Sequence, residues 1–418
     1  MALIPTQRLQ LLNALLVIQQ QHGADNQAVA MLLHERGRAR QQQRRRHWVR
    51  QWLIRRPMYG MYEKLMGELE REDVVGFRNL IRMEPHRFYE LLQRIGDRIT
   101  KQNTWYRKSL EPGLKLAITL RYYATGDSYH SLMYSFRVSH NTISKIVLEV
   151  SRAIVAELAV EVISCPTTPR EWQASADMFA EKWQFLHAMG ALDGKHVRIR
   201  CPAKGGSLYY NYKGFHSIIL MALVDAEYKF MWIDVGTAGS HSDAQVFNHS
   251  ELKHAIDTGI IGFPDATPLP GDDKDVPYFL IGDDAFALKT WMMKPYGIRN
   301  LDHDQRIFNY RLSRGRRIVE NAFGILSSRF RCLLTTMLQT PETVAMIVEA
   351  CVCLHNQMRK WAPDVRVTSR CRPRRRKPPS GPWRLEERSG DGGCEQSSRW
   401  KPSEQGSKGT ACLPQALL

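Results

Sequence analysis

The chain of 418 residues is 43% hydrophobic and 24% charged, which is typical of globular proteins and excludes wholly disordered, collagen-like and disulfide-framework classes. At roughly 150 residues per domain, this length predicts two or three domains. No apolar run approaches the ~18 residues of a membrane span, and the first residues lack the basic segment and cleavage site of a secretory signal. We therefore expect no membrane association.

The net charge of +17 is concentrated in two arms. Residues 34–57 hold nine arginines against one glutamate, and residues 364–418 hold twelve basic against six acidic side chains, whereas the block 58–363 has 37 basic and 34 acidic residues. Basic arms on a nearly neutral body favour a polyanionic partner, most simply DNA; the alternative is that they serve only solubility or nuclear import. The run RRRK at residues 374–377 suits an import signal, so we expect the nucleus, with a cytoplasmic pool besides.

The eight cysteines include a C-x-C at Cys351 and Cys353 but no C-x-x-C pair. This spacing indicates neither a disulfide framework nor a zinc site. We expect a reducing intracellular compartment, with most of the thiols as small buried apolar side chains or, beyond Cys371, as thiols of the tail.

After a basic N-terminal arm of residues 1–57, residues 58–160 are predicted to form an all-α domain, because their apolar side chains recur at helical spacing. Within it, a short helix near Tyr129–Tyr134 and a second from about Asn141, capped by Ser139, have helix-turn-helix spacing. A hairpin of this size is either a DNA-reading module or a plain packing unit. In the first case the second helix offers a DNA groove His140, Asn141, Thr142, Ser144 and Lys145.

Beyond Pro166 and Pro169 the apolar pattern changes to period two and to short runs, which indicates strands. The predicted elements are strands at 185–200, 217–225 and 229–236, a helix at 242–256, a strand at 278–282, and helices at 288–294, 315–328 and 341–361. The order β-β-β-α-β-α predicts an α/β domain over residues 180–362, with a mixed sheet and helices on its faces. Residues 363–418 are rich in Arg, Pro, Ser and Gly and are predicted to be a disordered basic tail.

Three carboxylates lie at positions that suit a metal-binding catalytic site. Asp193 lies within the first apolar strand, Asp283 ends the fourth, and Glu320 lies in the middle of a helix. Carboxylates from two strands and a helix are the oxygen ligands that two divalent ions need for phosphoryl transfer. Taken singly, Asp193 could instead accept turn hydrogen bonds, Asp283 could cap the next helix, and Glu320 could pair with an arginine at 316 or 317.

Ordered motifs run through the second half of the chain. They are LDGKHV at 192–197, GS-x-x-YNYKGF at 206–215, VD at 224–225, G-x-x-GS-x-SD-x-x-VF at 236–247, GD-x-A at 282–285, FN-x-x-LS-x-x-R at 308–316 and VE-x-x-FG-x-L-x-x-RF at 319–330. Together, over about residues 44–361, they resemble the PIF/Harbinger transposase superfamily and its domesticated members, the harbinger transposase-derived nucleases.

The resemblance implies an RNase H-like catalytic domain, in agreement with the element order, and a DDE triad at Asp193, Asp283 and Glu320. It makes Asp243 a further candidate metal ligand, although a carboxylate at a helix start also complements the helix dipole. Asp284 follows Asp283 where the family usually has a small residue, so the Gly-Asp spacing selects Asp283. The implied cofactor is Mg²⁺ or Mn²⁺. Candidate phosphate contacts are Lys195, His196, Tyr212 and Lys213.

The predicted function is that of a divalent-metal-dependent endonuclease that cuts DNA phosphodiester bonds by a two-metal DDE mechanism. The alternative is a catalytically silent DNA-binding or chromatin-associated protein domesticated from a transposase. The resemblance also implies a separate Myb-like DNA-binding protein as partner, and it is compatible with a homo-oligomer. No feature marks a reader of 2′-hydroxyl groups, which disfavours an RNA:DNA hybrid as substrate.

Overall fold

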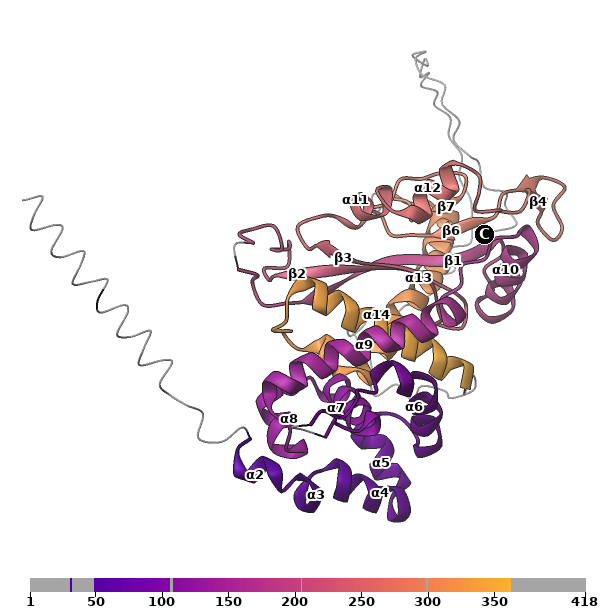
Figure 1. Cartoon of the computed structure of the whole chain (residues 1–418). Helices are drawn as coiled ribbons and strands as arrows, with labels where there is room; N and C mark the ends of the chain where they lie inside the picture. The colour runs from indigo at the N-terminus through magenta and orange to yellow at the C-terminus, as the bar shows by residue number, and fades with distance from the viewer. Residues whose placement is uncertain (1–30, 32–48, 106–107, 204, 298–299, 362–418) are drawn as a thin grey trace, which may run out of the picture.

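The computed structural model of the protein describes residues 31, 49–105, 108–203, 205–297 and 300–361 (Figure 1). Most of the predicted N-terminal arm, the predicted tail and the basic run at 374–377 lie outside the described residues. None of the helices that the structure describes is long and apolar enough to cross a membrane. Helices come first along the described chain, and a sheet with further helices follows.

The part of the chain before the sheet is built of helices. In order they are α2 (Gln51–Ile54), α3 (Arg56–Tyr59), the π-helical turn η1 (Tyr62–Met66), α4 (Gly67–Glu72), α5 (Val74–Ile81), α6 (Pro85–Ile99), α7 (Pro112–Thr125), α8 (Tyr129–Phe136), α9 (His140–Val162) and α10 (Pro169–Trp183). In α6, Phe88, Leu91, Ile95 and Ile99 are buried at intervals of three or four residues. This spacing places them on the face that packs against the core.

The predicted helical hairpin is formed by α8 and α9. Ser128 caps α8 by accepting a hydrogen bond from the Ser131 amide (3.2 Å), and Arg137 ends it in the left-handed conformation (φ 51°). Ser139 occupies the N-cap position of α9, but its side chain makes no capping hydrogen bond, so that detail of the prediction is wrong. The exposed side chains at the start of α9 are Asn141, Ser144 and Lys145. Their DNA-reading role stays a prediction.

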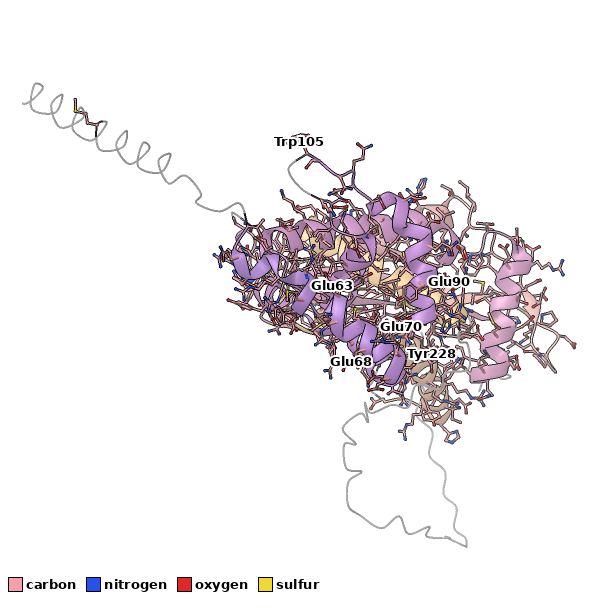
Figure 2. The ribbon with its side chains drawn as sticks, turned by 60° about the horizontal axis from the view of Figure 1, so that its bottom comes forward. Glu63, Glu68, Glu70, Glu90, Trp105 and Tyr228 are labelled. Carbon is pink, nitrogen blue, oxygen red and sulfur yellow. The ribbon has the colours of Figure 1, made fainter. Side chains whose placement is uncertain are left out.

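The surface near η1 and α4 carries charges of both signs. Figure 2 shows Glu63, Glu68 and Glu70 on these helices. Glu63 pairs with Arg56 (3.0 Å), Glu70 accepts a hydrogen bond from the Tyr89 hydroxyl (2.8 Å), and Lys64 is exposed beside them.

Helix α10 corrects a sequence prediction. The prolines at 166 and 169 indicated a change to strands, but Pro169 is the first residue of a 15-residue helix. Proline is well tolerated there because the first helical N–H needs no partner. Thr168 and Glu171 complete a capping box, in which the Thr168 hydroxyl accepts from the Glu171 amide and the Glu171 carboxylate accepts from the Thr168 amide.

The sheet is mixed and has five strands in the order β3-β2-β1-β6-β7. They are β1 (Ala188–Arg198), β2 (Ser217–Val224), β3 (Phe230–Ala238), β6 (Phe279–Ile281) and β7 (Met292–Met293), while β4 (Thr267–Pro268) and β5 (Asp275–Val276) form a separate two-stranded sheet. β1, β2 and β3 form the predicted antiparallel meander, and β6 and β7 run parallel to β1. The mixed α/β sheet is therefore confirmed.

Two predicted helices differ in the structure. The predicted helix at 242–256 is two helices, α11 (Asp243–Asn248) and α12 (Glu251–Asp257), because Ser250 caps a new start by accepting from the Lys253 amide. The predicted helix at 288–294 is wrong: β7 lies there and pairs with β6. The last elements are α13 (His303–Arg329), the 3₁₀ turn η2 (Arg331–Leu334) and α14 (Pro341–Trp361).

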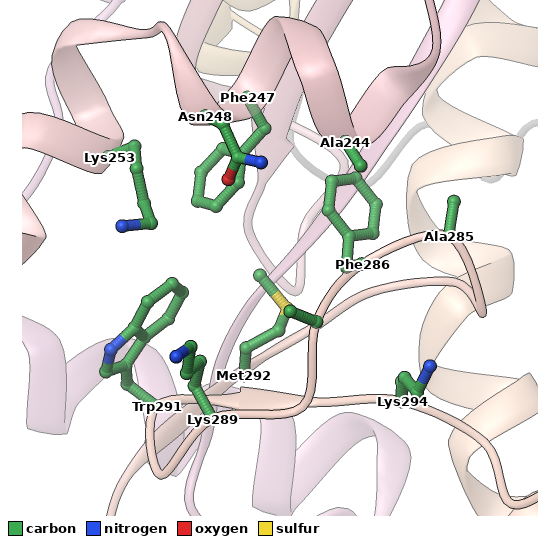
Figure 3. A pocket seen from close by; sticks show the side chains of 11 residues that line it. Ala244, Phe247, Asn248, Lys253, Ala285, Phe286, Lys289, Trp291, Met292 and Lys294 are labelled. Carbon is green, nitrogen blue, oxygen red and sulfur yellow. The ribbon is translucent and has the colours of Figure 1, made fainter.

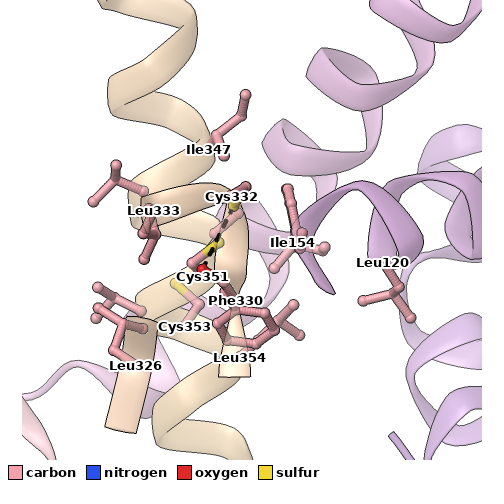
Figure 4. Close-up of a cluster of buried hydrophobic side chains, with 14 of the residues drawn as sticks. Leu120, Ile154, Leu326, Phe330, Cys332, Leu333, Ile347, Cys351, Cys353 and Leu354 are labelled. Carbon is pink, nitrogen blue, oxygen red and sulfur yellow. Dashed lines mark hydrogen bonds between the residues drawn. The ribbon is translucent and has the colours of Figure 1, made fainter. Parts of the chain in front are cut away.

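Both faces of the sheet are covered by helices. In Figure 1, α9, α13 and α14 lie on one side and α11 and α12 on the other. The first side shares one continuous apolar core with the N-terminal helices, so the division into separate helical and catalytic domains stays a prediction. Figure 4 shows this core where Leu120 and Ile154 face Phe330 and Leu354. Buried Cys332, Cys351 and Cys353 lie within it as free thiols, as the cysteine spacing predicted.

Asn356 of α14 joins three parts of this core. It is fully buried; its Oδ1 accepts from the Phe230 amide of β3 (3.0 Å), and its Nδ2 donates to the carbonyls of Phe230 and Val162 (2.8 Å each). Replacing it with alanine leaves buried backbone groups unpaired, so we expect Asn356→Ala to lower the free energy of unfolding by on the order of 3 kcal/mol.

Urea denaturation of the full chain measures this loss. Gln357→Met is the matched control, because the neighbouring Gln357 is also buried but its Oε1 has no hydrogen-bond partner among the described residues. We expect the control to cost less than about 1 kcal/mol. Equal destabilisation by the two variants would show that the three hydrogen bonds of Asn356 do not contribute measurably to the free energy of unfolding.

Candidate metal centre

The register of the parallel pair β1 and β6 brings two aspartates together. Ala191 of β1 pairs with Ile281 of β6, and two residues further along each chain come Asp193 and Asp283. Side chains two apart on a strand point to the same face, so the same offset places the two carboxylates next to each other. The Asp283 carboxylate also accepts a hydrogen bond from the Ala285 amide (3.0 Å), which fixes the turn after β6.

The third carboxylate, Asp243, comes from the first residue of α11. Ser242 and Gln245 form a capping box that sets where this helix starts. Gly194 makes room for the side chain: a Cβ at this position would lie 2.1 Å from Asp243 Oδ1. Sequence analysis missed this role of Gly194, because only the packing of α11 against β1 reveals it.

Asp193, Asp243 and Asp283 each offer a carboxylate oxygen, and these oxygens all lie within 4.8 Å of one another. Among the described residues, no lysine, arginine or histidine forms an ion pair with any of the three. Like charges held this close without a paired cation are unfavourable. Such a group of hard oxygen donors fits a divalent cation of the Mg²⁺ type.

The pKa values of two of these groups reflect this environment. Burial, and to a smaller extent the charges of Asp243 and Asp283, raise the pKa of Asp193 to about 7, against opposing effects of a backbone hydrogen bond and of Arg316. Burial and the neighbouring Asp283 raise the pKa of Asp243, which Lys213 partly offsets. Asp193, with a pKa of about 7, would therefore lose a proton when a cation binds near neutral pH.

The remaining acidic candidates lie differently. Glu320 of α13 is 56% exposed and lies 3.9 Å from Arg316 on the same helix; it is not a member of the three-carboxylate group. Asp284 is 78% exposed and pairs with Lys294 (3.2 Å), whereas Asp283 lies in the three-carboxylate group.

Helix α13 nevertheless lies near the cluster. Lys195, on the same face of β1 as Asp193, has its ammonium 5.9 Å from the centre of the Phe323 ring. Glu320 lies three residues before Phe323, about one helical turn away. Burial and the nearby Lys213 lower the pKa of Lys195.

The other candidate phosphate contacts form a group at the end of β1. The Nδ1 atom of His196 lies 3.0 Å from Ser217 Oγ, within hydrogen-bond distance. The His196 ring packs against the Tyr212 ring, and their centroids are 5.6 Å apart. The Lys213 ammonium lies 5.1 Å from the Tyr212 ring centre. The loop that follows β1 therefore adds a cation and an exposed aromatic ring close to the carboxylates.

Comparisons with known proteins show which sequences the chain is similar to. The model of the DDE superfamily endonuclease family matches residues 192–356. The human protein "Putative nuclease HARBI1" is 27% identical over 314 residues, which cover 74% of this chain and 85% of that protein, and its Xenopus laevis counterpart is 27% identical over 275 residues, 65% and 75% of the two chains. "Protein ALP1-like" of Arabidopsis thaliana is 23% identical over 249 residues, 58% and 59% of the two chains. No solved structure matches.

The matched segment contains all four predicted acidic residues, from Asp193 in β1 to Glu320 in α13. DDE endonuclease domains use divalent metals, and the cluster of Asp193, Asp243 and Asp283 offers the donors for one. Residues 192–356 match the DDE superfamily endonuclease family, and the chain is similar to nuclease-named relatives over about three quarters of its length, in agreement with the predicted resemblance to the Harbinger transposase-derived nucleases.

Proposed function

We propose that the protein is a divalent-metal-dependent endonuclease that cuts DNA phosphodiester bonds by a two-metal mechanism. The observation that carries the proposal is the group of three carboxylate oxygens within 4.8 Å of one another. The nuclease names of the animal relatives and the DDE endonuclease domain support it. Divalent ions held by the carboxylates would activate the attacking water and stabilise the leaving oxygen.

The chain's own residues divide the remaining work. Asp193 and Asp283, fixed by the register of β1 and β6, hold the ions together with Asp243. Glu320 completes the ligand set from α13, which already contacts β1 through Phe323 and Lys195. Lys213 on the adjacent loop lies close enough to Asp243 to lower the pKa of that carboxyl, and at this position its ammonium would bind a phosphate of the DNA strand.

The partners and the location follow from charge and from the resemblance. We propose that DNA is the substrate, that a separate Myb-like protein supplies sequence specificity, and that the enzyme acts in the nucleus, with a cytoplasmic pool. The net charge of +17 supports a polyanionic partner. A homo-oligomer would bring two such centres to the two strands of one duplex.

Cleavage of supercoiled plasmid by the purified full chain tests the proposal. We expect nicking in Mg²⁺ or Mn²⁺ and none in EDTA. Nicking of the same extent in EDTA would exclude the metal mechanism. Metal-saturated protein that binds DNA without cutting it would favour a DNA-binding protein that has lost catalysis.

Glu320→Gln tests the fourth ligand in the same assay. Because the side chain is mostly exposed, we expect the free energy of unfolding to change by less than about 0.5 kcal/mol, while cleavage falls at least about 100-fold. Glu342→Gln is the control, because Glu342 is also an exposed glutamate and lies in the first turn of α14. Full cleavage by Glu320→Gln would remove Glu320 from the proposed ligand set.

A further inference from the structure

A cavity of about 520 Å³ opens beside the carboxylate cluster. It lies between α11 and α12 on one side and the segment from β6 to β7 on the other (Figure 3). Its volume is within the range of small-molecule sites, roughly 300–1,000 Å³. The predicted DDE motifs do not account for the side chains from 286 to 294 that form half of it.

Aromatic rings form the inner wall of the cavity. The Phe247 ring lies edge-on to Phe286 with the centroids 5.7 Å apart and tilted to Trp291 at 6.1 Å. Phe247 and Phe286 are buried, and Met292 closes the base, whereas Trp291 is only partly buried. Part of the Trp291 ring is therefore accessible from the cavity.

Lysines surround these rings. Lys253 pairs with Asp257 and holds its ammonium 5.6 Å from the Trp291 ring centre. Lys294 pairs with Asp284. Lys289 is exposed and has no ion-pair partner among the described residues. The cavity thus combines an aromatic surface with one uncompensated positive charge at its mouth, a combination that suits a ring joined to an anion.

The position of the cavity restricts the ligand further. Ala244, on its wall, directly follows Asp243, and Ala285 comes two residues after Asp283. Neighbouring Cα atoms are about 3.8 Å apart, so these two lining residues lie next to the carboxylates. When a phosphate of a DNA strand lies at the carboxylates, a neighbouring nucleotide of that strand is within reach of the cavity.

We propose that this cavity receives a nucleobase displaced from the helical stack close to the bond to be cut. Trp291 stacks on the base, and Lys289 binds the phosphate of the same nucleotide. Stacking on an aromatic side chain tolerates any base, and displacement is least costly for a nucleotide that is already unpaired. The inference rests on the proposed function, since it takes the scissile phosphate to lie at the carboxylates.

Fluorescence anisotropy with the full chain in Ca²⁺ tests the assignment. Two duplexes of one sequence are compared, one fully paired and one with a single unpaired adenine, so that contacts common to both duplexes cancel in the ratio of their Kd values. We expect wild-type protein to bind the duplex with the unpaired adenine about tenfold tighter, the effect of one stacked base. Trp291→Ala and Lys289→Ala should bring this ratio close to one.

Two further variants serve as controls. Trp291→Phe keeps an aromatic ring and should retain most of the preference. Lys64→Ala removes one exposed positive charge from η1, far along the chain from the cavity, and should leave the ratio unchanged. Because Lys289 is exposed, its replacement tests the cavity even where Trp291→Ala disturbs packing.

The outcomes separate the cavity from the nuclease. A wild-type ratio near one, or a ratio that neither Trp291→Ala nor Lys289→Ala alters, overturns the assignment, whether or not the protein cuts plasmid in Mg²⁺. A preference for the unpaired adenine that depends on Trp291 and Lys289 supports it, even where cleavage in Mg²⁺ is absent and the proposed function fails.

Discussion

Replacing Asp193 with asparagine is expected to abolish metal-dependent cleavage and, at the same time, to stabilise the metal-free protein at neutral pH. The loss of cleavage follows from the removal of a charged ligand in the three-carboxylate cluster. The gain in stability follows from the pKa of Asp193, which the fold raises from 3.8 to about 7, mainly by burial. A residue kept at a cost in stability is typical of functional sites.

The direction of the pH dependence is fixed by where the proton is held. Between pH 4 and 7 the folded protein keeps a proton on Asp193 that the unfolded chain has released. The stability of the metal-free protein therefore falls as the pH rises through this window and levels off above it. Asparagine carries no charge, so its advantage above pH 7 is on the order of 4 kcal/mol, at about 1.36 kcal/mol per pKa unit.

Urea unfolding in EDTA at pH 4.5 and pH 8 measures this difference. Wild type and Asp193→Asn should be similarly stable at the lower pH and diverge at the higher. Asp97→Asn, which neutralises an exposed aspartate on α6, is the control and should not diverge. Added Mg²⁺ should stabilise wild type far more than Asp193→Asn; equal stabilisation of the two would mean that Mg²⁺ binds elsewhere.

Gly194→Ala is expected to lower Mg²⁺ affinity and cleavage by about 10- to 100-fold without removing a ligand. The added methyl would lie 2.1 Å from Asp243 Oδ1, so the carboxylate must move. Gly194 is not among the residues with positive φ, and alanine is therefore tolerated by the backbone. The substitution is therefore expected to move the Asp243 carboxylate and to leave the backbone of β1 unchanged.

Isothermal titration with Mg²⁺ and plasmid nicking would measure this loss. Gly96→Ala is the matched control, because a Cβ at Gly96 in α6 meets no atom within 4 Å. It should leave Mg²⁺ affinity unchanged and stabilise the helix by about 0.5–1 kcal/mol. Wild-type Mg²⁺ affinity in Gly194→Ala would show that Asp243 is not a ligand.

Much of the catalytic half could be predicted because its signals are local. All eight residues of β2 are buried, seven of them apolar, and the meander around it followed from the strand pattern. The prediction of a helix at 288–294 was wrong because β7 has only two residues, and its two methionines form a strand only by pairing with β6. Such an edge strand has no periodicity of its own to detect.

The candidate site, too, could be predicted from the sequence only in part. Asp193 and Asp283 were predicted at strand positions, and the parallel register then places them together. The membership of Asp243, and the space that Gly194 provides for it, depend on how α11 packs over β1. Glu320 shares the motifs of the resemblance, yet its side chain lies on the exposed side of α13 near Arg316, which a motif alone does not reveal.

Because α9 and α14 pack in one core, α9 cannot be fully buried until the ribosome has synthesised α14. Asn356 and Lys360 of α14 bond to the carbonyls of Val162 and Glu161 at the end of α9, yet about 180–200 residues separate the two helices along the chain. At about 5–20 residues per second, a ribosome completes α14 about 10–40 s after α9. Throughout that interval the apolar face of α9 has no α14 to cover it, so we expect the nascent chain to depend on a chaperone until its last helix emerges.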